Sequence, residues 1–191
     1  MFNDRYGLTQ AVIEGRKTMT RRFIPDEFFG LTWDTRGDTL VYENEYGDFI
    51  DVRHSKYTRY KVGEVVAVAQ RYQDIFDYSN CVNPYDWEDD DKPSGWTNKM
   101  FTKAELMPHR IRITGIKCER LQDIQDADCL KEGVRYIPEI NKFYFEDVSR
   151  EAGFYFDNHR EAFATLIDKV SGRGTWGLNP LVVVYEFELV K

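Results

Sequence analysis

The sequence predicts an α+β domain built on a mixed β-barrel, with short flanking helices and a long acidic surface insertion. Several short apolar or alternating segments are typical of strands, and a few short amphipathic segments between them indicate helices. A stretch of low periodicity at 73–98 carries acids and prolines and is predicted to be the insertion. At 191 residues and 42% hydrophobic content, the chain can bury a core as one domain spanning 1–191.

The first half of the chain is predicted to contain one helix and several strands. Residues 8–14 form the helix, because Leu8, Ala11 and Val12 share a face, and Gly15 ends it. The predicted strands of this half are residues 18–24, 39–42, 48–52 and 65–69. The second and third form a hairpin with Gly47 in its turn, and the last is an apolar core strand that follows a tight turn at 61–64.

The second half is predicted to begin with a strand, because residues 109–116 alternate strictly between polar and apolar. A short helix at 127–131 ends at Glu132-Gly133, and a hairpin spans 134–145. Asn158 caps a longer helix, whose apolar face carries Ala162, Phe163, Leu166, Ile167 and Val170. A loop at 172–180 then leads to the final strand at 181–190.

Composition excludes several classes of function. The net charge of −7 argues against a general polyanion-binding protein, because phosphate contacts dominate non-specific nucleic-acid affinity. No apolar run reaches membrane-spanning length, and the N-terminal residues lack the pattern of a signal peptide. The three cysteines and three histidines lie too far apart for a zinc motif. We therefore expect a cytoplasmic protein with reduced thiols, without a metal, a cofactor or a membrane partner.

The most informative segment is 15–22, with the sequence Gly-Arg-Lys-Thr-Met-Thr-Arg-Arg. On a strand, Thr20 and Arg22 share one face, and Lys17 and Arg21 share the other. A lysine just beyond a helix end can reach over either face. Lys17, Thr20 and Arg22 are therefore predicted to converge on a pocket for an anion, a carbonyl oxygen or a nucleobase edge. On spacing alone, a solvated basic strand that stabilises a helix C-terminus is the simpler explanation.

This segment resembles the motif of the ASCH family, a branch of the PUA-like β-barrels, in which lysine follows a glycine by two residues and threonine and arginine come next. The matching residues here are Gly15, Lys17, Thr20 and Arg22. The chain is also similar to that family in further segments at 60–66, 111–124, 130–133, 163–167 and 174–187. The last two are similar to phage-associated members, and residues 26–60 and 73–98 lie mostly outside the resemblance.

The resemblance implies a PUA-like barrel that binds RNA or a modified nucleoside in a cleft beside the barrel. One ASCH branch hydrolyses the acetyl amide of N4-acetylcytidine, and this chain is similar to it at Lys17, Thr20 and Glu132. For those residues the resemblance implies a threonine nucleophile, a lysine base and a glutamate acid/base group. A partly buried lysine near arginines has a lowered pKa, as a base requires, and Arg22 is placed to hold the oxyanion.

Further ligand contacts are expected from Arg21, Gln70, Trp176 and Asn179. Gln70 stands where many phage-type relatives carry a glutamate, which leaves Glu132 as the main candidate carboxylate. Trp176 and Asn179 lie in a glycine-rich loop, where an aromatic ring and an amide can read a base. Their structural alternatives are a tryptophan that caps the core and an asparagine that forms a turn.

The sequence leaves three functions open. The leading hypothesis is binding of RNA or a modified nucleoside. The second is hydrolysis of an acyl-amide on a pyrimidine nucleoside by Lys17, Thr20 and Glu132. The third is a phage or mobile-element interaction protein, whose acidic run at 88–91 contacts a host partner. Net acidity favours a small ligand over long RNA. Arg22 is predicted to clamp the ligand, to pair with Glu132, or to do both.

Overall fold

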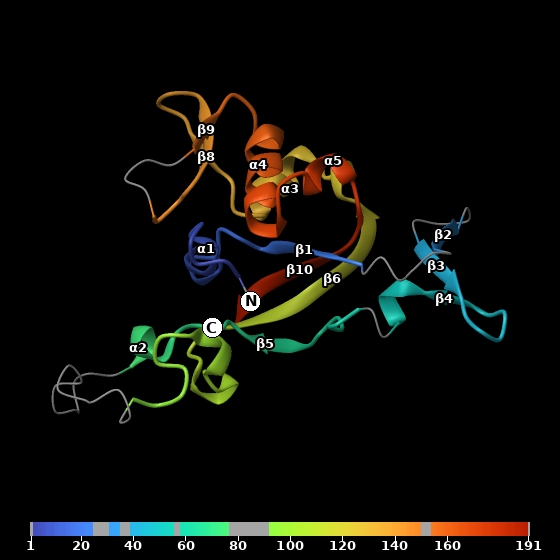
Figure 1. Ribbon diagram of the computed structural model, residues 1–191, viewed down its shortest axis with the longest axis horizontal. Helices are drawn as coiled ribbons and strands as arrows, with labels where there is room; N and C mark the ends of the chain where they lie inside the picture. The colour runs from blue at the N-terminus through green and yellow to red at the C-terminus, as the bar shows by residue number, and fades with distance from the viewer. Residues whose placement is uncertain are drawn as a thin grey trace.

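The structure, a computed structural model, describes residues 2–24, 31–34, 39–55, 58–76, 92–149 and 154–190, with the backbone alone at 31–34 and 39. Its main sheet is antiparallel, with the strand order β1-β10-β6-β5. These strands span Met19–Phe23 (β1), Leu181–Val190 (β10), Arg110–Arg120 (β6) and Val65–Ala67 (β5). Figure 1 shows the sheet running across the middle of the molecule, curled as half a barrel. The α+β class is confirmed.

The strand β10 is central because both of its faces are apolar. Its alternate residues enter two clusters of buried side chains, one containing Val182 and Val184, the other containing Val183, Tyr185 and Phe187. A strand buried on both faces carries a continuous apolar run instead of an alternating one. The register with β6 shifts between Glu186 and Phe187, which leaves Thr114 as the extra residue of a bulge. A bulge bends and twists a strand, which favours the curl of this sheet.

Helices cover the face of the sheet that carries the first cluster. They are α1 (Leu8–Ile13), α3 (Asp126–Lys131), α4 (His159–Ser171) and α5 (Thr175–Leu178). Figure 1 shows α3, α4 and α5 gathered along β1 and β10. The helix α4 begins where the Asn158 side chain accepts a hydrogen bond from the backbone N–H of Glu161, as an N-cap does. Its buried residues are those predicted for the apolar face, with Val170 partly buried at its end.

Two small antiparallel sheets extend the core at its ends. One contains β2 (Leu31–Asp34), β3 (Thr39–Glu43) and β4 (Phe49–Asp51), and Leu40 anchors it in the second cluster. The other contains β7 (Arg135–Ile137), β8 (Lys142–Phe145) and β9 (Phe154–Phe156), and Phe145 anchors it in the first cluster. Both predicted hairpins are confirmed. The strands β2 and β9 were not predicted.

The predicted insertion is described only at its two ends. Residues 73–76 belong to or follow α2 (Tyr72–Ile75), and residues 92–98 lead into short 3₁₀ helices at Lys99–Phe101 and Ala104–Leu106. Rings from the two ends meet, because Trp96 lies edge-on to Tyr72 and to Phe76, with ring centroids 6.0 Å and 5.5 Å apart. These rings anchor the insertion. Cys81, Trp87 and the acidic run at 88–91 lie outside the described residues.

Two expectations for the fold are only partly met. The segment at 65–69 was expected to be a core strand; Val68 is buried in the second cluster, but β5 covers only residues 65–67 at the edge of the described sheet, and Val65 is 43% exposed. An apolar run alone does not distinguish an edge strand from a buried one. The segment at 172–180 was expected to be a loop throughout, but it contains α5, which is only four residues long.

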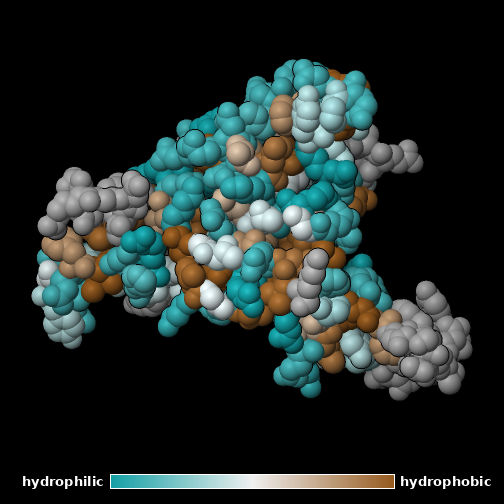
Figure 2. Space-filling model, turned by 180° about the vertical axis from the view of Figure 1, so that it is seen from behind, coloured by the Kyte–Doolittle hydropathy of each residue, from teal (hydrophilic) through white to brown (hydrophobic). Residues whose placement is uncertain are grey.

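The surface of the described residues carries several apolar side chains. Figure 2 shows hydrophobic side chains gathered in the lower middle of the face seen from behind, with hydrophilic side chains above them. The exposed large apolar residues include Val62, Met100, Phe101 and Leu106. In the described part of the chain, no helix has both the length and the apolar character that crossing a bilayer requires.

Candidate functional site

Lys17 is held in the interior between α1 and β1. Gly15, at φ +73°, ends α1 in the left-handed conformation that glycine adopts freely. The chain turns there, because the backbone N–H groups of residues 16 and 17 both donate to the carbonyl oxygen of Ala11. The Lys17 side chain is 2% exposed, and its Nζ donates to Met19 O and Glu132 O at 2.7 Å each and to Glu132 Oε2 at 2.6 Å. All three N–H groups of the ammonium therefore have acceptors.

Glu132 lies at the C-terminal end of α3 and bridges two buried cations. Its Oε2 accepts from Lys17, and its Oε1 accepts from Arg21 Nη1 at 2.9 Å. A helix C-terminus disfavours a carboxylate, so the two cations offset an unfavourable position. Gly133 follows at φ +112°, and a Cβ on this residue would lie 2.8 Å from Leu8 Cδ2. Glycine thus allows α1 to pack closely against this end of α3.

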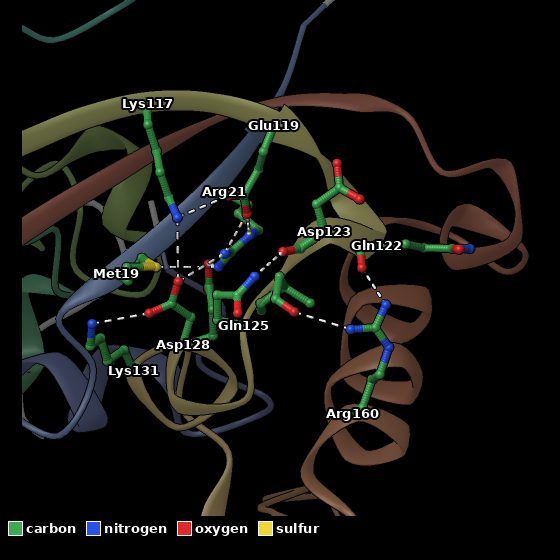
Figure 3. A network of polar contacts seen from close by, with 12 residues as sticks. Met19, Arg21, Lys117, Glu119, Gln122, Asp123, Gln125, Asp128, Lys131 and Arg160 are labelled. Carbon is green, nitrogen blue, oxygen red and sulfur yellow. Dashed lines mark hydrogen bonds and ion pairs between the residues drawn. The ribbon is translucent and has the colours of Figure 1, made fainter. Parts of the chain in front are cut away.

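Arg21 is the second buried cation. Met19 and Arg21 alternate with Thr20 along β1, and both share the buried side with Lys17, as predicted. Arg21 donates from Nε and Nη2 to Glu119 Oε1 at 3.0 Å and 2.6 Å. Figure 3 shows this contact and the proximity of the Met19 sulfur. The ion pair with Glu132 that the sequence assigned to Arg22 is made by Arg21, because Arg21 lies on the same side of β1 as Lys17.

Further charged side chains extend these contacts into a network (Figure 3). Lys117 Nζ lies 2.9 Å from Glu119 Oε2 and 3.5 Å from Asp128 Oδ2, and Lys131 Nζ lies 3.0 Å from Asp128 Oδ1. We call this set the ion network; its members are Lys17, Arg21, Lys117, Glu119, Asp128, Lys131 and Glu132. Asp128 was not predicted as a member. Asp128 lies four residues before Glu132 on α3, which places both on one helical face. This spacing could have indicated from the sequence that Asp128 belongs to the network.

The two buried cations differ in how firmly they hold their protons. Burial lowers the pKa of Lys17 below its usual value, Glu132 opposes this effect, and Arg22 and Arg21 lower the pKa further. Burial also acts against the charged form of Arg21, but the carboxylates of Glu132 and Glu119 outweigh it and raise the pKa of Arg21. Arg21 is therefore the permanent positive charge at Glu132, and Lys17 is the cation that loses its proton more readily.

A pocket of about 500 Å³ lies against the ion network. We call it the first pocket. Its polar lining residues are Asn3, Lys17, Thr20, Arg21, Arg22, Lys99, Glu132 and Ser171. Apolar side chains complete it, among them Phe2 from the N-terminal segment and Phe163 and Leu166 from α4. The Thr20 hydroxyl makes no hydrogen bond with any described residue. Thr20 is half-buried and Arg22 is exposed, so both polar groups line the pocket above a floor of buried charged residues.

A second pocket of about 480 Å³ adjoins the first and shares Phe2, Thr20, Arg22 and Lys99 with it. Lys99 is fixed in this shared wall, because its Nζ donates to Phe2 O and Asp4 Oδ1 at 2.6 Å each and to Thr9 Oγ1 at 3.1 Å. These bonds tie the segment after the insertion to the N-terminal residues. Phe2 and Lys99 were not predicted as site residues. Neither belongs to the motif at 15–22, and no pattern in the sequence around them indicates that they line a pocket.

The structure brings five of the predicted site residues together and places three elsewhere. Gln70, Trp176 and Asn179 line neither the first nor the second pocket. Gln70 Oε1 lies 3.0 Å from His109 Nδ1. The Trp176 ring lies edge-on to Phe163, and its backbone N–H donates to Asp168.

Asn179 adopts a left-handed conformation at φ +46° and accepts a hydrogen bond from the backbone N–H of Gln122. The contacts of Trp176 and Asn179 are those of the structural alternatives, a tryptophan that packs on the core and an asparagine that forms a turn.

The described residues contain no cluster of side chains suited to a metal ion. Cys118 and Cys129 are buried free thiols, and burial raises the pKa of each to about 12. A thiol with a raised pKa is a poor nucleophile and a poor metal ligand at neutral pH. These two cysteines therefore act as small core residues.

Comparisons of this chain with protein-family models, with curated proteins and with solved structures give no match.

Proposed function

We propose that this protein is a PUA-like domain of the ASCH type that binds a modified pyrimidine nucleoside, or the short RNA element that carries it, in the first pocket. The observation that carries the proposal is the pairing of an apolar wall with polar groups in one pocket of about 500 Å³. Phe2, Phe163 and Leu166 suit the flat faces of a base, and Thr20 and Arg22 suit its carbonyl oxygens and ring nitrogens.

The charge distribution supports a small ligand over a long polymer. The chain has a net charge of −7, whereas Lys17, Arg21, Arg22 and Lys99 line the first pocket with Glu132 as its acidic residue. A local basic site on an acidic protein attracts a compact polar group, while the rest of the surface repels an extended polyanion. The free thiols of Cys118 and Cys129 support the cytoplasmic location that belongs to this proposal.

A calorimetric titration with N4-acetylcytidine tests the proposal. The wild type is expected to bind this nucleoside, and Thr20→Val is expected to weaken binding by about 1 kcal/mol, or roughly fivefold in Kd, because a hydroxyl that bonds the ligand is lost. Thr18→Val is the matched control, since Thr18 lies on the same segment and does not line the first pocket. Absence of binding to the wild type, or equal loss in both variants, contradicts the proposal.

The same geometry favours one second function, hydrolysis of the acetyl amide. The observation that favours it is the Thr20 hydroxyl in a pocket that also contains Lys17 and Glu132. In the proposed step Thr20 Oγ1 attacks the acetyl carbon and its proton passes to neutral Lys17. Arg22 stabilises the oxyanion, the C–N bond breaks, and the cytosine amine takes the proton that Lys17 received from Thr20, directly or through the Glu132 carboxylate as a relay. Water then hydrolyses the acetyl-threonine ester.

The pH dependence distinguishes hydrolysis from binding alone. Lys17 must be neutral to accept a proton, and burial lowers its pKa below the ordinary 10.5. The rate of acetyl release is therefore expected to rise with pH through an inflection below 10.5 and to level off above it. Release is measured as conversion of N4-acetylcytidine to cytidine. Thr20→Ser is expected to retain the activity and Thr20→Val to lose it. No conversion above that of Thr20→Val at any pH rejects hydrolysis and leaves the binding proposal standing.

A further inference from the structure

The second pocket differs from the first in its charge. Among its described lining residues, Arg22, Arg59 and Lys99 are basic and none is acidic. Lys99 is held by Asp4 at 2.6 Å, so the exposed guanidinium groups of Arg22 and Arg59 are the basic groups of this wall that a ligand can reach. Arg59 is exposed, so its guanidinium is accessible from solvent. This arrangement suits a phosphate group, which guanidinium groups bind with paired hydrogen bonds.

Aromatic and apolar side chains form the rest of the second pocket. Tyr60 lies edge-on to Tyr185, with ring centroids 5.4 Å apart, and the Arg59 guanidinium lies over the Tyr60 ring at 5.5 Å. The backbone N–H of Arg59 donates to the Tyr185 hydroxyl at 2.9 Å, which fixes this segment against β10. Met100, 66% exposed, lines the same pocket. An aromatic ring beside a guanidinium is a platform on which a base can stack.

The two pockets are continuous through a shared wall. Phe2, Thr20, Arg22 and Lys99 line both, so a group that leaves the first pocket past Arg22 enters the second. A nucleoside in the first pocket would carry its ribose hydroxyls toward this wall, where a phosphodiester meets Arg22 and Arg59. The following or preceding base would then reach Tyr60.

We propose that the second pocket binds the neighbouring nucleotide, so that the ligand is a single-stranded RNA segment whose phosphodiester lies between Arg22 and Arg59 and whose second base stacks on Tyr60. This inference rests on the proposed function, because it takes the modified nucleoside to occupy the first pocket. According to this proposal, the protein contacts at least two successive nucleotides of its ligand. A single strand is required, because each pocket is concave and takes an unpaired base.

The test compares ligands of increasing length by calorimetric titration. The probes are N4-acetylcytidine, its 3′- and 5′-monophosphates, and two dinucleotides that carry uridine on the 3′ or the 5′ side of N4-acetylcytidine. At least one dinucleotide is expected to bind about tenfold tighter than the nucleoside or more, since each stacked base and each phosphate contact adds affinity. The monophosphate on the same side is expected to show only part of this gain.

Variants of the second pocket assign the gain to its residues. Arg59→Ala and Tyr60→Leu are expected to remove most of the tenfold gain while the Kd of the nucleoside stays unchanged. Arg59 is exposed, so its variant tests the inference even if Tyr60→Leu fails to fold. Arg112→Ala is the charge-matched control, because Arg112 is exposed and lines neither pocket.

Two sets of results overturn this inference and leave the proposed function intact. In the first, the nucleoside binds, but neither dinucleotide binds tighter than the corresponding monophosphate. In the second, Arg59→Ala and Tyr60→Leu leave the affinity of the dinucleotide unchanged. Failure of the nucleoside and of every longer probe to bind the wild type contradicts the proposed function itself.

Discussion

Replacing Glu132 by glutamine is expected to lower the free energy of unfolding by about 3–5 kcal/mol, because it leaves two buried cations without their shared counter-charge. Lys17 is 2% exposed, and Glu132 supplies two of its three acceptors. The substitution removes the negative charge and replaces one of the two carboxylate oxygens by an NH2 group, which cannot accept from a cation, while the carbonyl acceptors of Met19 and residue 132 remain. Arg21 loses the charge at 2.9 Å but keeps Glu119. Denaturant unfolding of both proteins measures the difference.

Two further variants show whether the cost comes from the buried charge. Glu188→Gln removes a carboxylate from an exposed ion pair with Arg112 and is expected to cost about 1 kcal/mol or less. The double variant Lys17→Met/Glu132→Gln is expected to be more stable than Glu132→Gln alone, because it removes the cation left without a charged partner. Equal losses for Glu132→Gln and Glu188→Gln would contradict the described role of the ion network.

Arg22→Ala is expected to weaken N4-acetylcytidine binding by about 2 kcal/mol, or roughly thirtyfold in Kd, because a charged donor to the ligand is lost. Arg22 is exposed at the end of β1 and lines both pockets, so its substitution removes a contact from each. The unfolding free energy is expected to change much less than in Glu132→Gln, since an exposed arginine contributes little to stability. Titration calorimetry gives the Kd and thermal unfolding gives the stability.

Arg112→Ala serves as the control for the loss of one positive charge. It is expected to leave the Kd of the nucleoside within about twofold of the wild type, because Arg112 pairs with Glu188 outside the two pockets. A thirtyfold loss in Arg112→Ala would assign the effect to net charge. An unchanged Kd in Arg22→Ala would remove Arg22 from the site.

Strong local patterns explain the parts of the fold that the sequence predicted. The apolar run of β10 and the capped amphipathic helix after Asn158 each specify their own structure, and both are confirmed. The strands β2 and β9 have four and three residues. A strand this short forms only because it pairs with a neighbour, so its own residues carry too little periodicity to reveal it.

In the candidate site, too, local sequence patterns predicted some contacts, whereas contacts between distant segments could not be predicted. Alternation along β1 groups Lys17 with Arg21, and the structure places Glu132 in contact with both. The choice between Arg21 and Arg22 as the partner of Glu132 depends on which side of β1 meets α3. That packing involves residues more than a hundred positions apart, and no local pattern encodes it.

Gln70 and Trp176 illustrate the limit of reading polar and aromatic residues as ligand contacts. Gln70 contacts His109, and Trp176 packs against Phe163. In both cases the side-chain group that was expected to bind a ligand instead contacts a residue from another segment of the chain. Such partners depend on how β6 and α4 pack, which the sequence near Gln70 and Trp176 does not specify.

A crystal structure of the protein soaked with N4-acetylcytidine shows directly whether the first pocket is the nucleoside site. We expect electron density for the nucleoside in the first pocket, with its base beside Phe2 and Phe163 and a hydrogen bond from Thr20 or Arg22 to the ligand. The ion network is expected to retain its contacts beneath it. Density for the nucleoside at another place on the surface, or an empty first pocket at a saturating concentration, would show that the first pocket is not the nucleoside site.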